Sequence, residues 1–167
     1  MDDRRAMLAH FLAALAYRTQ KALRGAPASF ASFEAGNQVR TPHWLVAHMD
    51  GVLGYALTCF EGEETRYRSS LLPTFDAEVE RFHGKLEALA RHLRTGTPLR
   101  SATPEQLLQG PFADAMTHAG QLAMLRRLAG SPIPPENFIV AKISAANVGP
   151  DQPEPASPDV EWPERPR

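Results

Sequence analysis

Residues 73–93 read PTFDAEVERFHGKLEALARHL, and this stretch carries the most regular hydrophobic pattern of the 167-residue chain. Its apolar residues recur in alternating steps of four and three: Phe75, Val79, Phe82, Leu86, Leu89 and Leu93. That spacing places them on one face of an α-helix and is typical of the seam of a helix bundle. The segment therefore predicts an amphipathic helix that needs other helices to cover its apolar face.

Two further helices are expected before this segment. Residues 2–23 carry apolar side chains at helical spacing, which predicts a helix with one buried face. These residues are Leu8, Phe11, Leu12, Leu15, Thr19, Ala22 and Leu23. The basic residues that are expected to face solvent are Arg4, Arg5, Arg18 and Lys21. Thr41 and Pro42 then match a helix N-cap followed by proline at the first helical position, which predicts a second helix to about Phe60. Its inward stripe is predicted to be Leu45, His48, Val52, Tyr55, Ala56 and Cys59, with Trp44 and Met49 on the flanks.

A fourth helix is expected from Thr103-Pro104, which repeats the cap-and-proline signal, to Leu128, with a break at Gly110-Pro111. The sequence thus predicts an all-α fold, a four-helix bundle over residues 1–130. The link from Glu61 to Leu72 could extend about 40 Å, which is longer than the helices and permits a parallel crossover.

The last part of the chain, residues 131–167, differs in composition because most of the prolines lie there. It is expected to form an extended Pro-rich C-terminal segment, partly packed and partly disordered. Residues 137–143 would pack on the bundle or on a second subunit, residues 149–167 would be a solvated tail, and Trp162 is the one anchor with enough apolar area.

Composition excludes several classes of function. Eighteen Lys and Arg balance nineteen Asp and Glu, for a formal net charge of −1. No positive electrostatic potential that would attract nucleic acid is therefore expected. No apolar run approaches the roughly 20 residues that span a bilayer, so no membrane association is expected. Cys59 is the single cysteine, which excludes an intrachain disulfide framework and makes the cytoplasm the expected location.

The candidate chemistry lies on the second and fourth helices. Read backward from Leu128, the fourth-helix seam is Leu125, Gln121, His118 and Asp114, so two ionisable groups one turn apart are predicted to point inward. His48 interrupts an otherwise apolar stripe of the second helix. Two imidazoles and a carboxylate converging from facing helices suit a metal ion. The alternative is a local hydrogen-bonded pair of Asp114 and His118, with His48 satisfied by a backbone carbonyl; the other histidines are predicted to be solvated (His10, His83 and His92) or at the rim (His43).

Over about residues 1–145 the chain resembles the DinB/YfiT-like metal-binding four-helix bundles. The resemblance rests on Trp44-Leu45-Val46-Ala47-His48 and on residues 114–122, DAMTHAGQL, which are similar to the family's helix-four pattern His-x-x-x-His-x-Gly-Gln-Leu. By that resemblance His48 and His118 would be metal ligands, and Asp114 stands where the family more often has a histidine. The resemblance also implies an up-down-down-up bundle and a homodimer.

The function expected from this site is that of a metal-dependent enzyme. Zinc or nickel, and otherwise iron or manganese, would be held by His48, Asp114 and His118, and Gln121 would be a supporting or pocket residue. Members of the resembled family include enzymes that act with low-molecular-weight thiols as transferases or isomerases, and hydrolase-like proteins, so a small-molecule or thiol substrate is expected. The alternative is a non-catalytic dimeric bundle with a structural or empty site.

Overall fold

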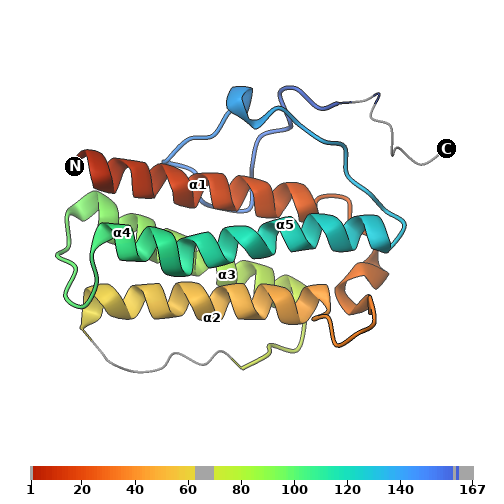
Figure 1. Ribbon diagram of the computed structural model, residues 1–167, viewed down its shortest axis with the longest axis horizontal. Helices are drawn as coiled ribbons and strands as arrows, with labels where there is room; N and C mark the ends of the chain where they lie inside the picture. Colours follow the sequence, from red (N-terminus) through yellow and green to blue (C-terminus); the bar gives the residue numbers. More distant parts are fainter. Residues whose placement is uncertain (1, 63–69, 160, 162–167) are drawn as a thin grey trace.

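The computed structural model describes residues 2–62, 70–159 and 161, and these residues are helical or irregular, with no β-strand among them. The long helices of this part are α1 (Asp3–Leu23), α2 (Pro42–Glu61), α3 (Phe75–Thr95) and α5 (Ala113–Leu128) (Figure 1). The shorter elements are the 3-10 helices η1 (Ala28–Ser32) and η3 (Phe138–Val140), the helix α4 (Pro104–Leu107) and the π-helical segment η2 (Leu108–Phe112). The all-helical class predicted from the sequence is confirmed.

The four long helices lie side by side around one core. α1 packs against α3 and α5, and α2 packs against the same two helices. Figure 1 shows α1 and α5 running in one direction and α2 and α3 in the opposite one. Because α2 and α3 are parallel, the end of α2 and the start of α3 lie at opposite ends of these helices. Residues 63–69 of the link between them lie outside the described part.

Polar side chains begin the helices at the predicted places. The backbone N–H of Arg5 donates to Oδ1 of Asp2, 3.0 Å away, and that of Trp44 donates to Oγ1 of Thr41, 3.4 Å away. Each of these bonds satisfies an amide that has no partner within its own helix. The C-terminal end of α3 is closed by Gly96, which adopts a left-handed φ of 74°. Residues with a Cβ disfavour this conformation, and glycine commonly ends helices in it.

The predicted break in the fourth helix is a change of helix type rather than a gap. Pro111 lies inside η2, between α4 and α5. Proline cannot donate the helical hydrogen bond and crowds the preceding turn, so an ordinary α-helix would be kinked or broken there. The wider π turn accommodates it, and the chain continues into α5 along the same path.

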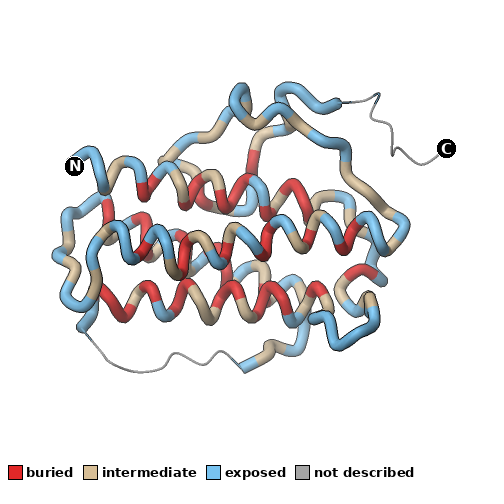
Figure 2. The backbone as a smooth tube through the Cα atoms, viewed as in Figure 1, coloured by how far each residue is buried: buried red, intermediate tan, exposed pale blue. Residues whose placement is uncertain are grey.

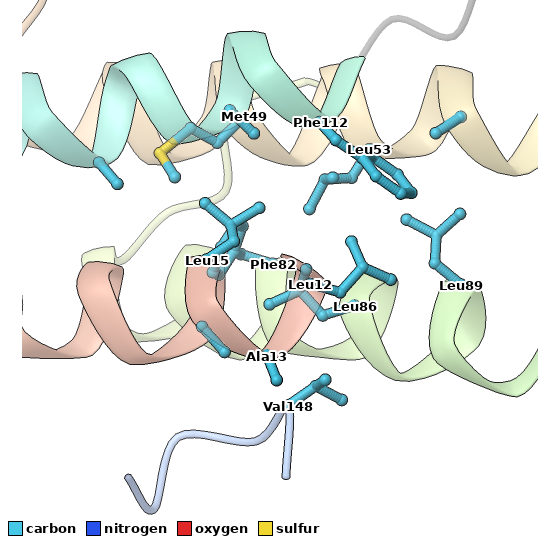
Figure 3. Close-up of a cluster of buried hydrophobic side chains, with 14 of the residues drawn as sticks. Leu12, Ala13, Leu15, Met49, Leu53, Phe82, Leu86, Leu89, Phe112 and Val148 are labelled. Carbon is cyan, nitrogen blue, oxygen red and sulfur yellow. The ribbon is translucent and has the colours of Figure 1, made fainter. Parts of the chain in front are cut away.

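The predicted α3 seam is the centre of the core. Phe82, Leu86 and Leu89 are completely buried and meet side chains from the other helices in Figure 3, where Leu12 and Leu15 of α1 and Met49 and Leu53 of α2 surround them. Figure 2 shows buried positions recurring along the inner side of each long helix. This burial accounts for the mutual packing of four helices, none of which could cover its own apolar face.

The predicted inward face of α2 is wrong by part of a turn. Met49, which was expected on the flank, is fully buried, whereas Tyr55, expected inside, is 54% exposed. Val52 is only partly buried. The reason is that α2 has apolar side chains nearly all around its circumference, so the hydrophobic pattern does not distinguish the core face from its neighbours.

The face of α5 is shifted in the same way. His118 and Leu125 of the predicted seam are buried as expected, but Leu128, its predicted end, is 58% exposed. The buried face also contains residues that the seam did not include, namely Ala115, Ala119 and Leu122. Alanines and methionines surround this helix and weaken the contrast between its faces. As a result the row that carries Asp114, His118 and Gln121 lies beside the core, on the side toward α2.

The C-terminal segment folds back over α1, and two predictions for it need correction. Lys21, expected in water, is 8% exposed because its Nζ lies 3.0 Å from Oε2 of Glu136 and donates to the backbone O of Pro134. Glu136 also accepts a hydrogen bond from the hydroxyl of Tyr17 at 2.6 Å. Residues 149–159, expected as a solvated tail, include the buried Gln152; Trp162 lies outside the described residues. Extended proline-rich chain can pack through its backbone carbonyls, which hydrophobic periodicity does not reveal.

His83 is a further correction, because it was predicted to be solvated and is 5% exposed. Its Nδ1–H donates to the backbone O of Val148 and its Nε2 accepts from Gln20, both at 2.8 Å. The C-terminal segment therefore covers the outer side of α3 at this residue. Burial lowers the pKa of His83, and the hydrogen bond to Val148 partly opposes that effect.

Candidate metal centre

His48, Asp114 and His118, the predicted metal ligands, come together between α2 and α5. Nε2 of His48 lies 3.8 Å from Oδ2 of Asp114, and Nε2 of His118 lies 3.1 Å from Oδ1 of the same carboxylate. The two imidazole rings cross at 78° with their centroids 4.7 Å apart. The carboxylate therefore lies against both imidazoles, one from each helix.

The spacing of these side chains suits a single ion. One ligand atom from each residue lies within 4.8 Å of the other two. Ligands about 2.1 Å from a tetrahedral ion are about 3.4 Å from one another. The two carboxylate–imidazole distances bracket that value, and small side-chain rotations would close the widest spacing. His48, Asp114 and His118 could thus hold a metal ion, and their donor set is compatible with several divalent transition metals.

The orientation of His118 favours this use. Its Nδ1–H donates to Oε1 of Gln121 at 2.8 Å, which leaves Nε2 without a proton and turned toward Asp114 and His48. That Nε2 atom is buried and makes no hydrogen bond within the described part of the chain. A buried acceptor without a donor is costly, and a cation would satisfy it. Gln121, predicted as a supporting or pocket residue, thus contacts the imidazole of His118 and not the space between the three candidate ligands.

The local charges also keep His48 ready to bind a cation. Burial lowers the pKa of His48, Coulombic interactions with Arg40 and His118 lower it further, and the carboxylate of Asp114 opposes them. At neutral pH His48 is therefore the neutral imidazole that ligates metals. Asp114 differs from the prediction, because its side chain is 48% exposed rather than buried. Its position beside the core leaves one side of the centre open to solvent.

The alternative to a metal site was a local pair of Asp114 and His118 with His48 bonded to a backbone carbonyl, and the structure contains only the first of these two contacts. Asp114 and His118 do make the local contact one helical turn apart. The imidazole of His48, however, donates no hydrogen bond to a backbone carbonyl of any described residue. The histidines outside the centre are placed differently: His10 is exposed, His43 packs edge-on against Phe75, and His92 stacks on Phe60.

A groove of about 1010 Å³ opens on the solvent side of the centre. Its α2 wall presents Trp44, His48, Val52 and Tyr55, which recur on one face of the helix, and Asp114 stands on the opposite wall. The remaining lining residues are Arg40, Ala47, Gly51, Gln109, Gly110, Pro111, Ala113 and Thr117. Open concave sites of this size with mostly apolar walls and a few polar groups are typical of ligand-binding sites. The sequence did not predict the groove, although the excess of apolar residues on α2 was visible.

Sequence reasoning also missed a buried ion-pair network on the other side of α2. Nε of Arg81 lies 3.1 Å from Oδ2 of Asp50, and its NH2 lies 2.7 Å from Oε2 of Glu78. Both carboxylate side chains are fully buried. Charges of this kind are invisible to a hydrophobic pattern, because each partner reads as a surface residue. Cys59, by contrast, is buried as expected.

Comparisons with protein-family models, with curated proteins and with solved structures find nothing that matches this chain. Among the described residues, no helix combines the length and apolar character that crossing a bilayer demands.

Proposed function

We propose that the chain is a DinB-like, up-down-down-up four-helix bundle that works as a metal-dependent enzyme of the thiol-linked transferase, isomerase or hydrolase class. Zinc or nickel would be held by His48, Asp114 and His118. The observation that carries the proposal is that this cluster opens onto a groove instead of being sealed by apolar side chains. The directions of the four helices also agree with the resemblance on which the bundle type rests.

Three protein ligands leave room for a fourth group, and a bound ion would supply Lewis acidity that lowers the pKa of a water or thiol there. The chain's own residues would fix the site around that group. Gln121 holds the ring of His118 through its Nδ1–H, so Nε2 stays available. Arg40 adds positive charge near His48, which opposes protonation of the ligand.

A non-catalytic, dimeric bundle with a structural or empty metal site is the second candidate. It is favoured by Ile139 and Val140 on η3, which are 89% and 50% exposed. Exposed aliphatic side chains side by side are commonly covered by another protein surface. In that case a second copy of the chain would cover η3, and the cluster would serve only to hold α2 and α5 together.

The test is metal analysis of protein purified without a metal-affinity tag, followed by thiol-transfer and ester-hydrolysis assays of the loaded form. We expect about one equivalent of zinc or nickel per chain and turnover that is lost in His118→Ala. His10→Ala, which removes an exposed histidine of α1, is the matched control and should keep both metal and turnover. A loaded protein without turnover in either assay would favour the second candidate.

A further inference from the structure

The α2 wall of the groove is an apolar surface that extends beyond the core. Trp44 is 53% exposed and Tyr55 54% exposed, and Val52 lies between them on the same side of the helix. Single exposed apolar residues are ordinary, but an aligned row inside a concave surface is typical of a binding site. From Trp44 to Tyr55 this row extends about 16 Å along the helix.

The opposite wall leaves room for a molecule beside that row. It is formed by η2 and the start of α5, including Gly110 and Pro111. Apart from its chain neighbours and its own helix backbone, no atom lies within 4 Å of the place that a Cβ at Gly110 would take, so there is open space next to it. His48 and Asp114 face each other across the groove, since His48 stands between Arg40 and Tyr55 in the lining of one wall and Asp114 lies on the other.

The charges of the groove select among ligands. Arg40 is the only Lys or Arg and Asp114 the only carboxylate among the described lining residues. Arg40 makes no ion pair with any described residue, so its guanidinium is available to an incoming anion. A single guanidinium fits a carboxylate, which it binds through two parallel N–H donors. A dianion would leave one charge uncompensated and would be repelled by Asp114.

We propose that this groove binds a small monoanionic amphiphile, a carboxylic acid with an alkyl or aromatic body, whose carboxylate pairs with Arg40 and whose body lies along Trp44, Val52 and Tyr55. The inference deepens the proposed function, on which it rests for the reaction that such a ligand would undergo beside His48. The apolar contacts supply affinity, and Arg40 supplies the preference for an acid over a neutral analogue of the same length.

The experiment uses Trp44 as its reporter. Trp44 and Trp162 are the two tryptophans of the chain, so in a Trp162→Phe background the tryptophan emission comes from the groove alone. Octanoate and octanol are titrated into this protein in EDTA, and the emission of Trp44 gives each dissociation constant. We expect octanoate to bind about tenfold more tightly than octanol.

Arg40→Gln should weaken octanoate about tenfold and leave octanol unchanged, which removes the preference. Arg91→Gln, at an exposed arginine of α3 outside the groove, is the matched control and should change neither ligand. Equal affinity for octanoate and octanol, an unchanged preference in Arg40→Gln, or no response of Trp44 would each overturn the inference. Because the titration is done without metal, its result is independent of metal binding, so failure of the proposed function and failure of this inference are separately visible.

Discussion

Replacing Asp114 with alanine should abolish metal binding while leaving the bundle almost as stable as the parent. The side chain is 48% exposed, and its carboxylate lies against the imidazoles of His48 and His118. A pair that is exposed to this degree contributes about 0–1 kcal/mol to folding. His118→Ala would be a less selective change, because the side chain of His118 is only 9% exposed and bonds to Gln121.

The contribution of the ion itself should be several times larger. A ligand at 100 times its dissociation constant stabilises the folded state by about 2.7 kcal/mol. Unfolding entropies near 2.1 cal/mol/K per residue give about 0.35 kcal/mol/K for a chain of this size. Metal should therefore raise the Tm of the parent by about 8 °C, whereas Asp114→Ala in EDTA should lose no more than about 3 °C.

Thermal unfolding in EDTA and in excess zinc or nickel checks both parts. We expect the rise of about 8 °C in the parent and in the control His10→Ala, and no rise in Asp114→Ala at the same metal concentration. An equal rise in Asp114→Ala would show that Asp114 is not a ligand. An Asp114→Ala protein that is already unfolded in EDTA would show that the cluster holds the bundle together, which favours the non-catalytic candidate.

Three further changes test other parts of the structure. Gln121→Leu removes the oxygen that accepts the hydrogen bond of His118 and should weaken metal binding about 10–100-fold in a calorimetric titration. Gln121→Glu keeps an acceptor oxygen and should keep the metal affinity. Equal losses of affinity in both variants would refute the orienting role of Gln121. Burial lowers the pKa of His83 below its ordinary 6.5, so the folded state binds fewer protons than the unfolded one. The stability of the protein in EDTA should therefore fall as the pH drops below about 6.5. Denaturant midpoints at successive pH values should show a less steep fall in His83→Gln. Glu136→Gln leaves the buried ammonium of Lys21 without its anion and should cost about 3 kcal/mol and expose the C-terminal segment to limited proteolysis; an unchanged midpoint and cleavage pattern would contradict this.

The helices and their limits could be predicted because their signals are local. Asp2, Thr41 and Thr103 cap helices through bonds to amides within the next turn, and proline after a threonine fixes the first helical residue. The α3 face could also be predicted, because charged residues interrupt its apolar stripe regularly. For α2 and α5 the existence of the helix followed from the sequence, but the angle of the buried face did not, since neither helix has a polar side broad enough to define it.

The long-range contacts were beyond a sequence pattern. Lys21 and Glu136 are more than a hundred residues apart, and each reads as a surface residue until the C-terminal segment brings them together. The same holds for His83, whose partner is a backbone carbonyl near the end of the chain. The candidate metal ligands could be predicted in spite of this, because two lie one turn apart on one helix and the third interrupts an apolar stripe. Their convergence required only that the two helices be neighbours.

The error in the face of α2 and the groove beside the metal centre have one physical cause. A helix that only packs into a core needs an apolar stripe of about 100°, and α2 has a wider one. Its inner part, with Met49 and Leu53, is buried completely, and the remaining part, with Trp44 and Tyr55, meets solvent in the groove. His48 stands on that outer part, next to the half-exposed Asp114. Apolar area beyond what a core requires lowers solubility unless something covers it. When such an excess shares a face with a histidine that could ligate a metal, the surface is better explained by a ligand than by packing.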